Sequence, residues 1–131
     1  MNTLIHSIPH KYQRYNTLGD YQKVDYADGA GTLQGAGVLI TVSQLGDWRY
    51  EFLIALHEFI EEALTRHRGI AEPDIMAFDL AHPDADDPGM LPEAPYHREH
   101  VTATAIEMLI AQELGVDWTA YGKACGEATK A

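Results

Sequence analysis

LIALHEFIEEAL, residues 53–64, predicts the central helix of the fold and also raises the question of function. Apolar residues recur at helical spacing from Trp48 to about His67, so the stretch predicts a long amphipathic helix. His57 and Glu61 are four positions apart and therefore project from one face of that helix, at the margin of its apolar arc. A histidine and a carboxylate one turn apart are typical of a metal-binding helix.

The segments around this helix predict an α+β fold in a single domain, because 131 residues suffice for one core. Residues 1–20 are polar and predict an irregular surface arm. Residues 21–47 predict a β-hairpin, with strands at 21–26 and 32–42 around a glycine-rich turn. The helical part is expected over 48–131. We therefore expect an N-terminal β-hairpin, or a small antiparallel sheet, packed on two long helices with shorter helices beside them.

Capping residues, glycines and prolines indicate where the helices begin and end. Asp47 is placed to cap the first long helix, and Gly69 is placed to end it. A shorter helix is predicted at 72–81 and a second long helix at 97–114, followed by a last short helix near the C-terminus. Residues 82–96 contain four prolines and several acids, and they predict a long loop between these helices.

Composition limits the classes of function. The chain has 9 basic and 20 acidic residues, a formal net charge of -11, which disfavours binding to a nucleic-acid backbone. No stretch has the apolar length of a membrane span or a signal peptide, so we expect a soluble cytoplasmic protein without membrane contact. Cys125 is the single cysteine, so any transition-metal site in the chain has to be built from histidine and carboxylate.

The second long helix offers a third ligand. Its apolar residues run nearly all round, as in a largely buried helix, and three polar residues interrupt them on one stripe: His100, Thr104 and Glu107. Buried polar groups require partners, so this stripe is expected to face the polar margin of the first helix. His100 is the candidate ligand, and His97, one turn earlier, is the substitute. The expected ion is Zn²⁺ or another divalent transition metal.

Other acids are candidates for positions around this site. Glu58 stands beside the ligands as a candidate general base, although it and Glu62 are expected to turn outward from the margin. Glu107 is a fourth ligand, a partner that orients His100, or a surface acid, and the second of these is preferred. Asp79 either joins the site or ends a helix. The acids of the 82–96 loop predict a solvated segment, or a flap over the site.

The same residues also permit a site without metal. His57 and Glu61 would then form a hydrogen-bonded pair at the border of the helix, and His100 would be a core histidine satisfied by Glu61 or Thr104.

With the preceding strand included, the chain resembles the small zincin-type metallopeptidases found with phage repressors. Those peptidases carry H-E-x-x-H on one helix and a motif similar to E-x-x-A-N-x-F-A on a later helix. Here HEFIE occupies 57–61 and HVTATAIE occupies 100–107. The resemblance implies a first ligand, a general base, a second ligand and a third ligand, in that order His57, Glu58, Glu61 and His100. The ligand types at the second and third positions are exchanged relative to that family.

The resemblance also implies an activity, namely metal-assisted hydrolysis of an amide in a peptide or protein substrate. The substrate would add a strand at residues 36–42, taken as the edge of the sheet, and Tyr96 or His97 would stabilise the oxyanion. The segments GDWRYEFLIALHEFIEEAL and APYHREHVTATAIE are similar to small uncharacterised proteins encoded in phages and prophages. A phage-encoded protein would work in the host cytoplasm.

Two further functions fit the residues. One is a non-catalytic phage accessory protein that binds a protein partner and uses the histidines and glutamates as a buried hydrogen-bond network. The other is a magnesium-dependent nucleotide pyrophosphohydrolase, suggested by Glu58, Glu61, Glu62 and Asp79. The sequence does not determine the oligomeric state.

Overall fold

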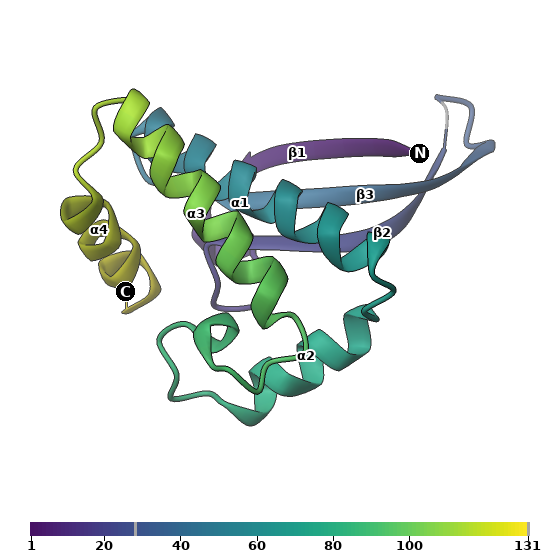
Figure 1. Cartoon of the computed structure of the whole chain (residues 1–131). Helices are drawn as coiled ribbons and strands as arrows, with labels where there is room; N and C mark the ends of the chain where they lie inside the picture. Colours follow the sequence, from purple (N-terminus) through teal and green to yellow (C-terminus); the bar gives the residue numbers. More distant parts are fainter. Residues whose placement is uncertain (28, 131) are drawn as a thin grey trace.

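A computed structural model describes residues 1–27 and 29–130 and has the predicted α+β class, with a three-stranded sheet and four α-helices in the described part of the chain (Figure 1). The strands and α-helices, in chain order, are β1 (Asn2–Ile8), β2 (Gly19–Ala27), β3 (Leu33–Ser43), α1 (Trp48–His67), α2 (Glu72–Ala81), α3 (His97–Glu113) and α4 (Trp118–Lys130). Short 3₁₀ turns lie at His10–Tyr12 and Pro88–Met90.

The sheet differs from the predicted hairpin in its first strand. Strands β2 and β3 form the expected antiparallel pair, but β1 lies parallel to β3 on its other side, in the order β1-β3-β2. The prediction of an irregular arm over residues 1–20 is therefore wrong, and the sheet is mixed. The sequence of residues 2–8 does not indicate a strand, because NTLIHSI has no clean alternation of apolar and polar residues. Its hydrogen bonds come from a strand some 35 positions later.

Strand β3 is the centre of the sheet and of the core. Val38, Ile40 and Val42 alternate along it and are almost wholly buried beneath α1, which contributes Leu53 and Ile54. Complete burial of each such side chain stabilises the fold by roughly 1.5–3 kcal/mol. Because β3 pairs on both sides, the expectation that residues 36–42 form a free edge for a substrate is wrong.

Helix α1 begins and ends as the sequence predicts. The Asp47 side chain accepts a hydrogen bond of 2.9 Å from the backbone N–H of Arg49, and Gly69 follows the helix with φ at +69°. The helix packs over β3 and β2 on one side and along α3 on the other (Figure 1). It therefore lies between the sheet and α3, which places its polar margin in the interior.

None of the helices in the described ranges is long and apolar enough to cross a membrane.

Candidate metal centre

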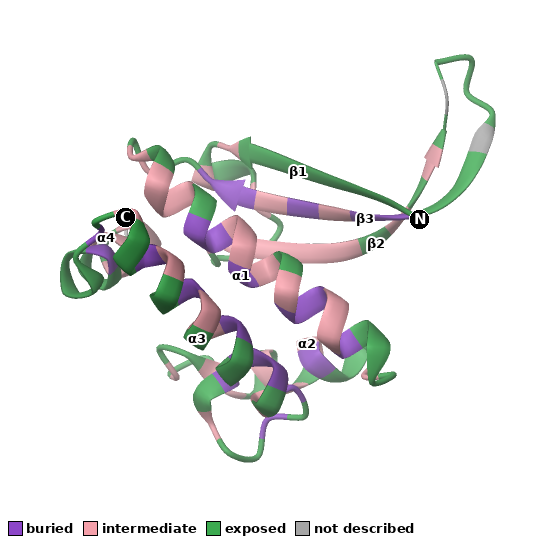
Figure 2. Ribbon diagram, turned by 45° about the horizontal axis from the view of Figure 1, so that its top comes forward, coloured by how far each residue is buried: buried purple, intermediate pink, exposed green. Residues whose placement is uncertain are grey.

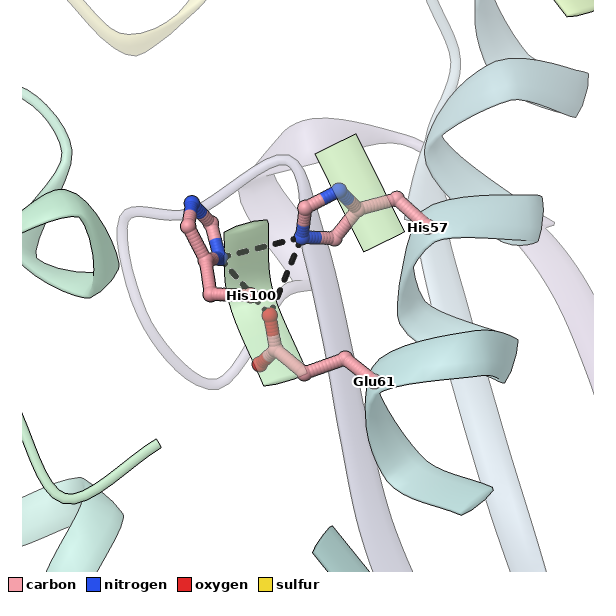
Figure 3. A group of neighbouring side chains, drawn as sticks. All are labelled: His57, Glu61 and His100. Atoms are coloured by element: carbon pink, nitrogen blue, oxygen red, sulfur yellow. Dashed lines mark hydrogen bonds and ion pairs between the residues drawn. The ribbon is translucent and has the colours of Figure 1, made fainter. Parts of the chain in front are cut away.

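Three side chains from two helices converge in the interior. His57 and Glu61 come from adjacent turns of α1, and His100 comes from the first turn of α3 (Figure 3). The Glu61 Oε2 atom lies 3.0 Å from His57 Nε2 and 2.7 Å from His100 Nδ1. The two ring nitrogens lie 3.2 Å apart. The packing of α3 on α1 thus brings together the three residues that the sequence selected as ligands.

The outer nitrogen of His57 is held by a carboxylate. Its Nδ1 lies 2.8 Å from Glu107 Oε1, and the other oxygen of Glu107 accepts a hydrogen bond of 2.6 Å from the Tyr121 hydroxyl on α4. An ionised carboxylate only accepts hydrogen bonds, so the ring proton of His57 belongs on Nδ1. In the neutral ring Nε2 then carries a lone pair, directed at the centre of the cluster.

The outer nitrogen of His100 also faces a carboxylate, but in this ring it is Nε2. Its Nε2 lies 2.9 Å from Asp87 Oδ1, and although the alignment is too poor for a full hydrogen bond, this buried nitrogen has no other partner in the described part of the molecule. Both nitrogens of this ring therefore face a carboxylate, Asp87 at Nε2 and Glu61 at Nδ1. A neutral ring that keeps its proton on Nε2 would leave Nδ1 with a lone pair for a metal ion. Gly89 packs so closely on this ring that a Cβ there would lie 2.5 Å from its Cγ atom.

Glu61 is held from the sheet. The Tyr21 hydroxyl on β2 donates a hydrogen bond of 3.1 Å to Glu61 Oε1, which leaves Oε2 to face the two histidines. Each of the three converging side chains thus has a polar partner on its outer side, from a different part of the fold. Such outer partners fix the tautomer and orientation of ligands in metal sites.

The three inner atoms need a cation between them. Two imidazole lone pairs and a carboxylate oxygen within 2.7–3.2 Å repel one another unless a proton or a metal ion is shared. Without metal, protons fill this role. Burial opposes the charged form of His57, but the bonds to Glu107 and Glu61 outweigh it and raise its pKa to about 11.

The pKa values of His100 and Glu61 are shifted by the same contacts. Burial opposes ionisation of His100, yet the neighbouring Asp87 and Glu61 carboxylates raise its pKa to about 9. Burial would raise the pKa of Glu61, but its hydrogen bonds to His100 and His57 lower it to about 2. Without metal, the cluster therefore retains its protons on the two histidines while Glu61 stays ionised.

The dimensions of the cluster suit a zinc ion. Two ligands bonded at about 2.05 Å in tetrahedral geometry lie roughly 3.3 Å apart, so the closest pair here would have to open by only about 0.6 Å. The three side chains are between 7% and 11% exposed, which leaves a narrow contact with solvent. Two histidines and one carboxylate form a known zinc ligand set with room for a fourth ligand.

Glu58 does not project into solvent as expected. Its carboxyl lies against Gly19 at the start of β2, where a Cβ on that glycine would meet Oε1 at 2.7 Å, and the residue is half-buried. Burial and the charge of Glu61 raise the pKa of Glu58 to about 8. Glu62 is also buried rather than outward, and it forms an ion pair of 2.8 Å with Arg66.

The remaining candidates occupy positions around the cluster rather than inside it. Glu107 orients a histidine as preferred, but the histidine is His57 and not His100, because Glu107 lies between His57 on α1 and Tyr121 on α4. Thr104 is half-buried and has no hydrogen bond to the cluster among the described residues. His97 contacts the Gly89 carbonyl through Nδ1 at 3.0 Å.

Asp79 also lies outside the cluster. It accepts a hydrogen bond of 2.5 Å from the Tyr96 hydroxyl, and the Tyr96 ring stands edge-on to His100 at a centroid distance of 6.0 Å. Burial raises the pKa of Asp79, with Glu61 and Asp87 acting in the same direction. With Glu62 paired to Arg66 and Asp79 to Tyr96, the acids proposed for magnesium are dispersed.

Sequence reasoning missed three residues of the site: Tyr21, Tyr121 and Asp87. The two tyrosines lie far from the motif in sequence, on β2 and α4, and carry no local pattern. Asp87 belongs to the acidic loop that was expected to be solvated or to form a flap, and its contact with His100 brings that loop onto the cluster.

Comparison of the chain with protein-family models, curated proteins and solved structures found no match. His57, Glu61 and His100 are the one group of ligand-type side chains in the described ranges whose ligand atoms converge closely enough to hold an ion.

Proposed function

We propose that this chain binds one divalent transition-metal ion, Zn²⁺ in the first instance, through His57 Nε2, Glu61 Oε2 and His100 Nδ1. One observation carries the proposal: three ligand-type atoms meet within 3.2 Å while the outer atom of each side chain faces its own polar partner. When the two rings give up their inner protons, the three atoms become converging acceptors, which is the arrangement that a metal site needs.

We further propose a hydrolytic role of zincin-like type, in a phage-encoded protein of the host cytoplasm, with a peptide or protein as substrate. A bound Zn²⁺ lowers the pKa of a water ligand and polarises a carbonyl. Glu58 is the general base. At neutral pH its carboxyl is largely protonated, because its pKa is raised to about 8. Base catalysis by Glu58 is therefore expected to increase as pH rises through about 8, where its carboxyl ionises.

The substrate would not bind by adding a strand beside the ligands. The outer edge of β2 is covered there, since Arg14 donates to the Tyr21 carbonyl at 3.3 Å and the Lys23 N–H donates to Glu72 at 3.4 Å. A peptide would have to displace both contacts, or approach from the side of the 82–96 loop.

A second candidate function is the non-catalytic accessory protein with a buried histidine–glutamate network. It is favoured by the depth of the cluster, whose side chains are about nine-tenths buried. In that case protons alone would link His57, His100 and Glu61, and no ion would bind.

The test is metal stoichiometry of the tag-free protein, measured by elemental analysis after zinc loading and desalting. We expect about one zinc per chain in the wild type. His57→Ala and Glu61→Ala should each lose it, whereas His67→Ala, which alters an exposed histidine at the end of the same helix, should keep it. A wild type without zinc after loading would refute the metal site and leave the accessory protein.

A further inference from the structure

The edge of the sheet formed by β1 lies open. Strand β1 pairs only with β3, and six of its seven residues are exposed (Figure 2). Beyond its pairing with β3, the backbone of residues 2–7 has no hydrogen-bond partner in the described part of the chain. A row of unpaired N–H and C=O groups is a template for another strand.

The opposite edge, β2, is protected. Arg14 and Glu72 occupy its outer backbone groups at Tyr21 and Lys23. Strand β1 has none of the usual protections, since its sequence NTLIHSI has no proline, no lysine and no carboxylate, and its pairing with β3 runs without a bulge. The two edges of one sheet are therefore treated differently, which indicates that the β1 edge is covered when the protein works.

An apolar groove lies beside this edge. Helix α1 covers β3 and β2 but leaves the helix-side face of β1 nearly bare. Ile5 shares that face with Ile40, its partner in register, and together with Trp48, Phe52 and Phe59 it lines a groove of about 550 Å³. These three aromatic residues are 66%, 46% and 45% exposed.

Charge indicates what covers this surface. None of the 20 acidic residues lies in residues 1–19, so β1 presents no carboxylate to a second chain of net charge -11. Glu51 also lines the groove, but its carboxylate accepts a hydrogen bond of 3.0 Å from the Leu45 N–H. An uncharged strand beside an apolar groove is complementary to its own copy.

We infer that the chain forms a two-fold homodimer in which β1 pairs antiparallel with β1 of a second copy. The two sheets become one six-stranded sheet, and both α1 helices lie on the same face of it. The aromatic rows of α1 then face each other above the paired strands. The three rings expose on the order of 300 Å² of apolar surface, to which Leu4, Ile5 and the strand itself add. A stable interface buries about 800 Å² per partner, so this surface supplies much of what a dimer needs.

The test is sedimentation of the full chain over a range of concentrations. As its concentration is raised, the wild type should sediment at twice the chain mass of 14.5 kDa before about 100 μM is reached. Ile5→Asp and Phe52→Asp, which place a charge at the inferred interface, should sediment as monomers. Leu80→Asp, which adds the same charge to an exposed leucine of α2, should remain dimeric.

Hydrogen exchange of the wild type tests the same interface without a substitution that could prevent folding. Backbone amides of residues 2–8 should exchange at least tenfold more slowly at concentrations where the dimer forms than on dilution. A wild type that stays monomeric, a dimer that persists in Ile5→Asp and Phe52→Asp, or a dimer whose β1 amides exchange as fast as the monomer's would each overturn it.

Discussion

His57 and His100 face each other nitrogen to nitrogen, 3.2 Å apart, with their rings inclined at 67°. Each ring directs its other nitrogen at a carboxylate, Glu107 for His57 and Asp87 for His100. The two facing nitrogens also lie 3.0 Å and 2.7 Å from Glu61 Oε2, so three ligand-type atoms converge. A cluster of this kind could hold a metal ion, and protons and metal would compete for it.

Zinc binding should release about two protons per ion between pH 7 and 8. Without metal, the pKa of His57 is raised to about 11 and that of His100 to about 9, so both rings are protonated in this range and must lose a proton to bind. Calorimetric titration in two buffers of different ionisation enthalpy measures the number. A release below half a proton would show that the rings are already neutral.

The stability of the metal-free protein should fall as pH rises, whereas that of the zinc-bound protein should rise. In the metal-free protein the histidine pKa values are raised, so the stabilisation is complete below about pH 6.5 and is lost as pH rises through 9 and 11. Glu58, whose pKa is raised to about 8, adds a loss between about pH 4.5 and 8 as its carboxyl ionises.

The melting temperature of the metal-free protein should therefore fall from pH 6 to pH 9, on the order of 10 °C. With excess zinc it should rise from pH 6 to pH 8, because deprotonated ligands bind the ion more tightly. Thermal melts with zinc and with a chelator make the comparison. Parallel curves in the two conditions would argue against metal binding at this cluster.

Glu107→Gln should weaken zinc binding by about 10- to 100-fold, since the amide no longer enforces the proton on His57 Nδ1. Tyr121→Phe removes only the hydrogen bond to Glu107, and about fivefold is expected from the loss of roughly 1 kcal/mol. Competition with a chromogenic chelator gives the affinities. Tyr12→Phe, at an exposed tyrosine, is the control, and equal affinities in all three variants would remove Glu107 from the site.

Gly89→Ala should lower zinc affinity at least about tenfold without removing a ligand, because the added Cβ would lie 2.5–2.8 Å from atoms of the His100 ring. Gly122→Ala is the matched control. Its Cβ would meet nothing within 4 Å, and alanine in helix α4 should raise stability by roughly 0.5–1 kcal/mol. An unchanged affinity in Gly89→Ala would show that the loop does not hold His100.

Glu58→Gln should separate binding from chemistry. The carboxyl is largely neutral at pH 7 because its pKa is raised to about 8, so the amide replaces it with little change in stability or zinc affinity. Hydrolysis of peptide substrates by the zinc-loaded protein should fall by about 10²- to 10⁴-fold, the usual contribution of a general base. Retained hydrolysis would assign the base to another group.

The sequence predicted the elements whose signals are local. The limits of α1 follow from apolar spacing and from Asp47, and the β2–β3 pair follows from the alternation of Val38, Ile40 and Val42. Strand β1 escaped prediction because its stabilisation comes from pairing with β3, a non-local contact that leaves no periodic pattern in residues 2–8.

The residues of the site likewise include some that local spacing predicts and some that it does not. His57 and Glu61 lie on one helix, so a spacing of four residues placed them together, and His100 was found as a polar interruption of a buried helix. The partners Tyr21, Tyr121 and Asp87 come from β2, α4 and the 82–96 loop, where no spacing relates them to the motif.

The sequence by itself thus determined the helices, the β2–β3 hairpin and the three inward residues, because helical and strand periods fix which side chains share a face. Only the tertiary structure decided that β1 closes one side of the sheet and leaves an open edge. It also decided that Glu107 orients His57 and that Glu58 lies against Gly19 rather than in solvent. These relationships depend on how helices and strands pack in space, and packing joins residues that no local period connects.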